Sequence, residues 1–176
     1  MDALVGFESM FGNTEAIARA VGEGLSARMD TEVIEVGAAP RVIDGTIGLL
    51  VVGGPTHAFG MSRPGTRQTA AQQAGSRLVS QGIGLREWLA ALRVESATAS
   101  STFDTRTFKP RVPGSAARAA AKRLRTLGFR EVATAESFYV RGTDGPLIEG
   151  ELDRARFWGE QLGSAVIEAK ANLTMS

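Results

Sequence analysis

The pattern of apolar and polar positions divides the chain into alternating extended and helical segments. Continuous apolar or β-branched runs predict five strands, at residues 3–7, 31–37, 46–53, 97–103 and 129–140. Ile17, Val21 and Leu25 recur at helical spacing and give one apolar helix face. Similar patterns predict helices at about residues 13–28, 63–73, 85–92, 115–127 and 150–171. Strands that alternate with helices in this way indicate a parallel, doubly wound α/β fold.

Two connections depart from this alternation. Residues 38–45 are too few for a full crossover helix, since such connections usually take roughly a dozen residues or more, so we expect a single turn or a short helix there. Residues 75–84 interrupt a helical pattern and predict an excursion within one long crossover. No internal repeat, linker or low-complexity segment divides the sequence, and we expect residues 1–176 to form one domain.

Composition excludes several kinds of site. The chain has no cysteine, which rules out disulfides, thiolate metal sites, iron–sulfur clusters and a cysteine nucleophile. Its single histidine argues against a transition-metal site built by the protein. No apolar run approaches the roughly 20 residues that span a bilayer, and the N-terminus lacks a basic region. We therefore expect a cytoplasmic protein with no membrane span.

The net charge of +1 gives no indication of a nucleic-acid partner, and none is expected. The distribution of charge is uneven, because residues 106–130 contain basic side chains and no acidic ones. The basic residues of this stretch are Arg106, Lys109, Arg111, Arg118, Lys122, Arg123, Arg125 and Arg130. A solvated helix face is one interpretation, and docking of an anionic partner or a phosphorylated cosubstrate is the other.

A hydroxyl-rich loop follows the first predicted strand and leads directly into the first helix. It contains Ser9, Gly12, Asn13 and Thr14. The first turn of a helix has backbone N–H groups without partners and a partial positive charge, so it can bind an anion without a basic side chain. Gly12 permits the positive φ that a nest of successive N–H groups requires. The loop predicts a phosphate-binding site, with helix capping by Ser, Asn or Thr as the alternative.

Two other kinds of phosphate loop do not fit this segment. A Walker loop needs Gly-Lys-Ser/Thr, but no Lys or Arg occurs between Met1 and Arg19. The dinucleotide fingerprint needs three spaced glycines, and only Gly6 and Gly12 are present. Sites for nucleoside triphosphates and Rossmann-type NAD sites are therefore disfavoured.

Three loops at predicted strand ends resemble those of the flavodoxin family. Residues 9–15 (SMFGNTE) are similar to the phosphate signature of the family, and residues 54–60 (GPTHAFG) to the loop that covers one face of the flavin ring. Residues 103–106 (FDTR) fall where the family has its last ring contacts. The order of elements matches over nearly the whole chain. The resemblance implies a flavodoxin-like doubly wound sandwich, with a five-stranded parallel sheet in the order 2-1-3-4-5 and helices on both faces.

The resemblance also implies a site for FMN, with its phosphate in the first loop and its isoalloxazine ring between the second and the third. The residues implied to bind FMN are Ser9, Met10, Phe11, Gly12, Asn13, Thr14, Pro55, Thr56, His57, Ala58, Phe59, Gly60, Phe103, Asp104, Thr105 and Arg106. With FMN bound, the redox chemistry belongs to the flavin, and the protein positions and tunes it.

The function implied by the resemblance is that of an FMN-binding redox protein in electron transfer. Its partner would be a redox protein or a small-molecule acceptor, with NAD(P)H as a candidate reductant. A one-electron carrier and an NAD(P)H-dependent reductase of quinones or similar acceptors both stay open. A flavodoxin-fold binding or regulatory domain that no longer holds flavin is the alternative.

Several residues depart from the family pattern. Phe11 stands where the family often has a hydroxyl, and Phe after Ser-Met is similar to the flavodoxin-like quinone reductases. Neither Trp nor Tyr occurs in the predicted ring loops, so His57, Phe59 and Phe103 are the stacking candidates. The resemblance places a peptide that responds to the oxidation state of the flavin between Phe59 and Gly60.

The predicted ring loops are also more basic than those of the acidic flavodoxins. They carry Arg63, Arg67, Arg106 and His57 against Asp104 alone. Two unit charges about 4 Å apart interact by roughly 4 kcal/mol at an effective dielectric constant of about 20. These arginines are therefore expected to favour reduced, anionic flavin, which predicts a higher reduction potential than acidic flavodoxins have.

Overall fold

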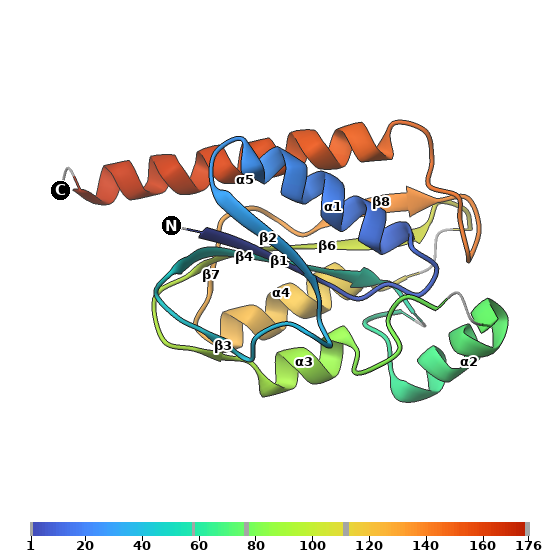
Figure 1. The fold of residues 1–176 in the computed structure, drawn as a ribbon. Coiled ribbons are helices and arrows are strands. Elements are labelled where there is room, and N and C mark those ends of the chain that lie inside the picture. The colour runs from blue at the N-terminus through green and yellow to red at the C-terminus, as the bar shows by residue number, and fades with distance from the viewer. Residues whose placement is uncertain (1, 58, 76–77, 111–112, 175–176) are drawn as a thin grey trace.

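The computed structural model describes residues 2–57, 59–75, 78–110 and 113–174, and its centre is a parallel sheet (Figure 1). The strands are β1 (Asp2–Phe7), β2 (Asp30–Glu35), β4 (Ile47–Pro55), β6 (Ala99–Thr107), β7 (Arg130–Glu131) and β8 (Glu136–Val140). They lie in the order β2-β1-β4-β6, with β7 and β8 both paired to the other side of β6. The predicted order 2-1-3-4-5 is confirmed, with the fifth strand divided into two short ones.

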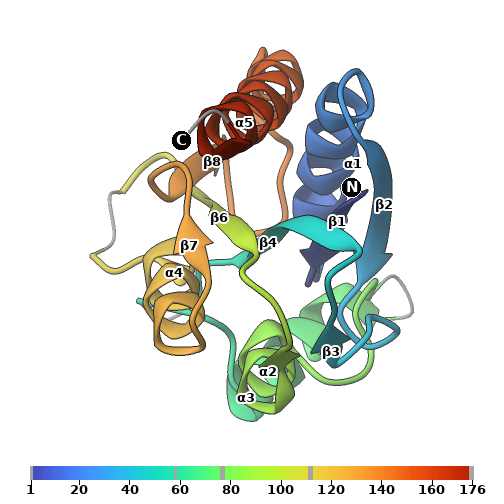
Figure 2. The ribbon, with the colours of Figure 1, turned by 90° about the vertical axis from the view of Figure 1, so that its left-hand side faces the viewer.

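Helices cover both faces of this sheet. α1 (Asn13–Ser26) and α5 (Glu151–Thr174) pack together on one face, and α3 (Leu85–Ala91) and α4 (Ala116–Thr126) cover the other (Figure 2). α2 (Pro64–Ala74) lies near the C-terminal ends of the strands (Figure 1). α1 buries Ile17, Val21 and Leu25, which is the predicted apolar face. Among the described helices, none is long and apolar enough to cross a membrane.

The connection from β2 to β4 is a turn followed by a very short strand. β3 (Val42–Ile43) pairs in parallel with β5 (Arg93–Val94) and forms a separate two-stranded sheet. Ile43 is fully buried, and the indole N–H of Trp88 donates to the carbonyl oxygen of Pro40 over 3.1 Å. Of the two predictions for residues 38–45, a turn rather than a short helix is therefore correct. The chain between β2 and β4 is too short for a helix and packs directly against α3.

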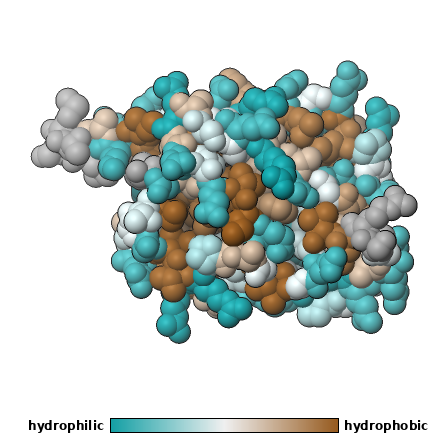
Figure 3. Space-filling model, in the orientation of Figure 1, coloured by the Kyte–Doolittle hydropathy of each residue, from teal (hydrophilic) through white to brown (hydrophobic). Residues whose placement is uncertain are grey.

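Two apolar cores hold the layers together. Between the sheet and the α1/α5 pair, the rings of Phe103, Phe138 and Trp158 meet edge to face, with centroids 6.1, 6.2 and 6.0 Å apart. Trp88 and Leu50 belong to the second core, between the sheet and the α3/α4 pair. On the outer surface, hydrophobic side chains show as separate patches among hydrophilic ones (Figure 3).

The register of the sheet brings three loops to one edge. Phe7 of β1 pairs with Gly53 of β4, and Gly53 pairs with Phe103 of β6. Because these strands are parallel, the loops that follow β1, β4 and β6 all leave the sheet at the same side. Ligands of open α/β sheets bind outside the carboxyl ends of the strands, so this edge is where a site is expected.

Candidate functional site

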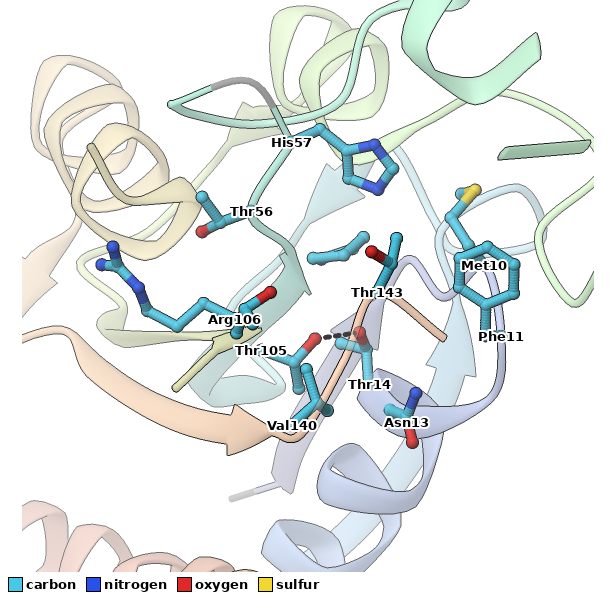
Figure 4. A pocket seen from close by; sticks show the side chains of 12 residues that line it. Met10, Phe11, Asn13, Thr14, Thr56, His57, Thr105, Arg106, Val140 and Thr143 are labelled. Atoms are coloured by element: carbon cyan, nitrogen blue, oxygen red, sulfur yellow. Dashed lines mark hydrogen bonds between the residues drawn. The ribbon is translucent and has the colours of Figure 1, made fainter. Parts of the chain in front are cut away.

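A cavity of about 220 Å³ opens at the carboxyl edge of the sheet, among the loops that follow β1, β4, β6 and β8 (Figure 4). The residues that line it are Met10, Phe11, Asn13, Thr14, Pro55, Thr56, His57, Thr105, Arg106, Thr107, Val140 and Thr143. A second cavity of about 260 Å³ shares Phe11, His57 and Thr143 with the first. The two cavities are therefore adjacent, and each one brings together residues that lie far apart in the sequence.

The first loop reaches α1 through a left-handed glycine. Gly12 has a φ of 91° and is the N-cap residue of α1, where it provides no side chain. Its carbonyl oxygen accepts from the N–H of Ala16 over 3.0 Å, so the amides of Asn13 and Thr14 precede the first hydrogen bond within the helix. No side chain caps the start of α1 in the part of the chain that the structure describes, so the capping alternative is wrong.

A neighbouring segment holds the first loop in place. The amide of Ser9 donates to the hydroxyl of Ser80 over 2.9 Å, and the amide of Ser80 donates to the carbonyl oxygen of Ser9 over 2.8 Å. The hydroxyl of Ser9 accepts from the amide of Gly12 over 3.1 Å and is fully buried. Ser9 and Gly12 therefore shape the loop from behind, while Met10, Phe11, Asn13 and Thr14 face the cavity.

The second loop turns sharply after β4. His57 and Gly60 exchange two backbone hydrogen bonds of 2.8 and 2.9 Å. The left-handed residue of this turn is Phe59, with a φ of 77°, whereas Gly60 is absent from the positive-φ residues. The amide of Gly60 is already bonded to His57, so the peptide implied to change orientation is held in place. Pro55, Thr56 and His57 line the cavity, Phe59 and Gly60 do not, and Ala58 lies outside the described residues.

The third loop begins later than the sequence pattern indicates. β6 continues to Thr107, four residues beyond the predicted strand end, so Phe103 and Asp104 are strand residues. Successive side chains of a strand point to opposite faces. Phe103 accordingly lies in the core beside α5, and the two residues do not line the cavity. The expectation that Phe103 stacks on a ring at the site is not supported by this position, and Thr105, Arg106 and Thr107 take its place in the wall.

Asp104 is a fully buried carboxylate with four hydrogen-bond donors. One oxygen accepts from Thr56 Oγ1 at 2.9 Å, Ser115 Oγ at 2.5 Å and the amide of Ala117 at 3.1 Å. The other oxygen accepts from Ser137 Oγ at 2.7 Å. Ser115 and Ala117 belong to the start of α4, where a negative charge is favoured by the helix dipole. The carboxylate of Asp104 therefore binds the start of α4 to the sheet.

Two of the three arginines that the sequence places near a ring do not line either described cavity. Arg67 donates to the hydroxyl of Ser62 and forms a 3.0 Å ion pair with Glu87. Arg63 is exposed at the start of α2 and does not line either cavity. Among Arg63, Arg67 and Arg106, only Arg106 is part of a described cavity wall.

Burial shifts the pKa of His57, which lines the cavity, and of Glu8, which precedes the first loop. Burial lowers the pKa of His57, and the positive charge of Arg67 lowers it further, so the imidazole is neutral at neutral pH. Glu8, directly before the first loop, is fully buried and accepts from Ser62 Oγ at 2.5 Å and from the amide of Leu85 at 2.7 Å. Burial raises the pKa of Glu8, although these hydrogen bonds oppose the increase.

The cavities also contain residues that sequence reasoning missed. Thr107, Val140 and Thr143 line the first cavity. The second is completed by α2 residues: Thr66, Thr69, Ala70 and Gln73. The rule that sites form beyond strand ends could have found Val140 and Thr143, because they end and follow the last strand. No signal in the sequence places α2 here, since its path depends on contacts with distant loops.

The walls of the first cavity supply hydrogen-bond donors, planar groups and one cation. Thr14, Thr56, Thr105 and Asn13 offer hydroxyl and amide groups, while Phe11 and His57 offer flat faces. Within the described residues, no three His, Cys, Asp or Glu side chains lie close enough to hold a metal ion. The arrangement suits a ligand with an anionic end and a flat apolar end.

Solved structures with the same fold include three that match this chain over nearly the whole length of both chains. An archaeal flavodoxin is 17% identical with a TM-score of 0.62, covering 94% of this chain and 99% of its own. Flavodoxin 1 from Bacillus cereus is 14% identical with a TM-score of 0.63, covering 96% and 98%. A flavodoxin, WrbA-like protein from Agrobacterium tumefaciens is 15% identical with a TM-score of 0.60, covering 95% and 98%. No family model and no curated protein matches the sequence. The chain has the flavodoxin-like fold.

Proposed function

We propose that residues 1–176 act as one flavodoxin-like domain that binds FMN at the carboxyl edge of the sheet and transfers electrons. The observation that carries this proposal is the start of α1, which has no side-chain cap and lies at the cavity beside Asn13 and Thr14. Uncapped amides at a helix N-terminus bind phosphate, and no acidic side chain is among the described residues that line these two adjacent cavities. Structures named as flavodoxins share the fold, which supports the same assignment.

The residues present fit FMN in kind. The amides of Asn13 and Thr14 and the hydroxyl of Thr14 would hold the phosphate, and Phe11 and His57 would lie against the ring. Ligand pockets for such molecules usually measure about 300 to 1,000 Å³. Each cavity alone is smaller, so FMN would extend from the first cavity of about 220 Å³ toward the second of about 260 Å³. Bound FMN would supply the electron-transfer chemistry.

The chain itself contributes little charge to this site. His57 is neutral because its pKa is lowered, and Asp104 is engaged with α4. Arg106 is the cation of the described cavity wall. We therefore expect the reduction potential of bound FMN to be raised by less than three arginines at the ring would raise it. The Coulomb interaction of a cation with the flavin weakens with distance, and weakens further when the cation is paired with an acid.

A reductase of quinones or similar acceptors, driven by NAD(P)H, is the second candidate. The specific feature that favours it is the second cavity, whose α2 wall carries the neutral polar groups of Thr66, Thr69 and Gln73. An acceptor held by these groups would lie beside the end of FMN that extends toward this cavity, whereas a pure electron carrier needs no such substrate contacts. Mixing FMN-loaded protein with NADPH or NADH under anaerobic conditions distinguishes the two, because a reductase bleaches the flavin and a carrier does not.

Flavin titration tests the main proposal. Purified protein is mixed with FMN or riboflavin, and the fluorescence and visible absorbance of the flavin are followed. We expect both flavins to bind, with FMN bound at least about tenfold more tightly. The reason is that the amides of Asn13 and Thr14 would contact the phosphate, which riboflavin lacks. Unchanged spectra with both flavins would favour the remaining candidate, a binding or regulatory domain of the same fold without flavin.

A further inference from the structure

Exposed acidic residues are concentrated on one face of the sheet, which also carries exposed Arg19, Arg28 and Lys170. The α1, β2 and α5 side carries most exposed acidic residues: Glu23, Asp30, Glu32, Asp153, Glu160 and Glu168. The α3 and α4 side carries exposed basic residues: Arg93, Arg118, Lys122, Arg125 and Arg130. The net charge of +1 conceals this separation, and a partner that approaches α4 meets a positive surface.

α4 presents two cations without a compensating acid. Arg118 and Lys122 are one helical turn apart and exposed, and no ion pair of either occurs in the described part of the chain. Arg125, the next cation on this side of the helix, pairs with Glu131 at 2.7 Å. Arg118 lies in the first turn of α4, which contains no acidic residue. A cation at this end opposes the helix dipole, so Arg118 does not stabilise α4 by its charge.

The start of α4 adjoins the candidate site directly. The amide of Ala116 donates to the hydroxyl of Thr56, a cavity residue, over 3.0 Å. A β-carbon at Gly114 would overlap the carbonyl oxygen of Phe59, so the segment before α4 packs tightly on the turn that follows β4. The cations of α4 therefore begin at the rim of the cavity and continue away from it.

Two aromatic rings are exposed at the same rim. Phe59 is 59% exposed although it adopts a left-handed φ of 77°, which a bulky residue rarely does. Phe108 follows the cavity residue Thr107 and is 42% exposed, with Lys109 Nζ 5.6 Å from its ring centroid. Phe59 gains little from burial to offset the strain of its backbone, and strain of this kind is found at functional sites.

We propose that Phe59, Phe108, Lys109, Arg118 and Lys122 form a docking surface for an acidic protein at the mouth of the candidate site. Aromatic anchors with neighbouring cations are the composition of protein interfaces. A nucleic-acid site usually neutralises about six to ten phosphates, and a lipid headgroup site uses about four to eight basic residues. Lys109, Arg118 and Lys122 are too few for either. Arg125 is paired with Glu131, and Arg130 lies opposite Ala99 at the start of β6, away from this rim. That the docked protein is a redox partner rests on the proposed function, whereas the docking itself does not.

The test compares charge reversals on the two faces. The probe is a small acidic [2Fe–2S] ferredoxin, and the basic protein cytochrome c serves as its opposite. Binding to the immobilised full chain, with and without added FMN, is measured at low and at high salt. The variant is Arg118→Glu with Lys122→Glu, and the matched control is Arg19→Glu on α1 with Arg28→Glu just after its end. We expect the α4 variant to weaken ferredoxin binding by about tenfold or more at low salt, and the α1 control by less than about twofold.

A second variant tests the aromatic part of the surface. Phe59→Gly removes the ring and suits the left-handed backbone, so the fold should be retained. We expect weaker ferredoxin binding by about threefold or more with an unchanged far-UV circular dichroism spectrum. This result would separate the ring's role in docking from a role in folding.

Several outcomes overturn the proposal. Equal weakening by the α1 control would mean that only overall charge matters. Tighter binding of cytochrome c, a DNA duplex or phosphatidylserine vesicles than of ferredoxin would exclude an acidic protein as the preferred occupant, as would the absence of any ferredoxin binding at low salt. If ferredoxin binds normally but FMN does not bind, the proposed function is rejected and the docking surface is retained.

Discussion

The hydroxyl groups of Thr14 and Thr105 are hydrogen-bonded, with an Oγ1–Oγ1 distance of 2.7 Å (Figure 4). Thr14 belongs to the first turn of α1 and Thr105 to the end of β6, so residues 91 positions apart share this bond. Both side chains line the cavity, and they are only 2% and 5% exposed. The pair therefore sets the distance between the expected phosphate end of the site and the β6 wall.

Thr14→Val should weaken the binding of FMN by about tenfold or more and the binding of riboflavin by less than about threefold. The substitution keeps the volume of the side chain and removes a hydroxyl that would donate to phosphate, a charged acceptor. Fluorescence titration of both flavins measures the ratio. Thr126→Val, on the exposed end of α4, is the matched control and should leave both affinities unchanged. Equal loss of both flavins in Thr14→Val would show that the hydroxyl does not contact the phosphate.

Asp104→Asn should destabilise the fold by about 2 to 4 kcal/mol, because the NH2 group that replaces one carboxylate oxygen cannot accept a hydrogen bond and faces buried donors. Thr56, Ser115 and Ser137 all donate to this carboxylate. Urea unfolding monitored by circular dichroism gives the free energy of unfolding. The same change at exposed Asp153 is the control and should have little effect. A loss below about 0.5 kcal/mol at Asp104 would mean that an amide replaces the carboxylate without cost.

Glu8 should make stability depend on pH. Its folded pKa is raised above the ordinary value of 4.5, so over the pH range between the two values the folded state retains a proton that the unfolded state releases. The contribution is fully present below the unfolded pKa of 4.5 and is lost as the pH rises through the raised folded pKa. The free energy of unfolding of the wild type should therefore fall relative to Glu8→Gln as the pH rises from about 4 to about 8. Urea unfolding of both proteins across this range measures the difference. A difference that does not vary with pH would show that the Glu8 pKa is not shifted.

His57 should titrate below its ordinary value of 6.5. It is the one histidine of the chain, so its imidazole resonances in an NMR pH titration need no assignment. Burial is the larger cause and Arg67 the smaller, so Arg67→Gln should raise the pKa partly and leave it below 6.5. Arg19→Gln on α1, far from the site in the sequence, is the control and should leave the titration unchanged. A pKa at or above 6.5 in the wild type would mean that the imidazole is more exposed to solvent than its position indicates.

Local sequence patterns predicted the secondary elements because those patterns reflect burial against a sheet. The apolar runs of β1 and β4 and the helical face of Ile17, Val21 and Leu25 lie where the periodicity placed them. The order of the strands followed from the alternation of strands and helices together with the family resemblance. The bend that divides the last strand into β7 and β8 left no periodic signal.

The three loops came to one edge of the sheet as the sequence alone predicted, since parallel strands must release their chains at the same side. The sequence also contained the glycine, hydroxyl and amide groups of the first loop and the excess of basic residues around α4. Only the tertiary structure decided that Phe103 lies in the core, that Arg67 pairs with Glu87 and that α2 lines the second cavity. A strand's length and the partner of a charge depend on contacts between residues far apart in the chain, and periodicity carries no information about such contacts.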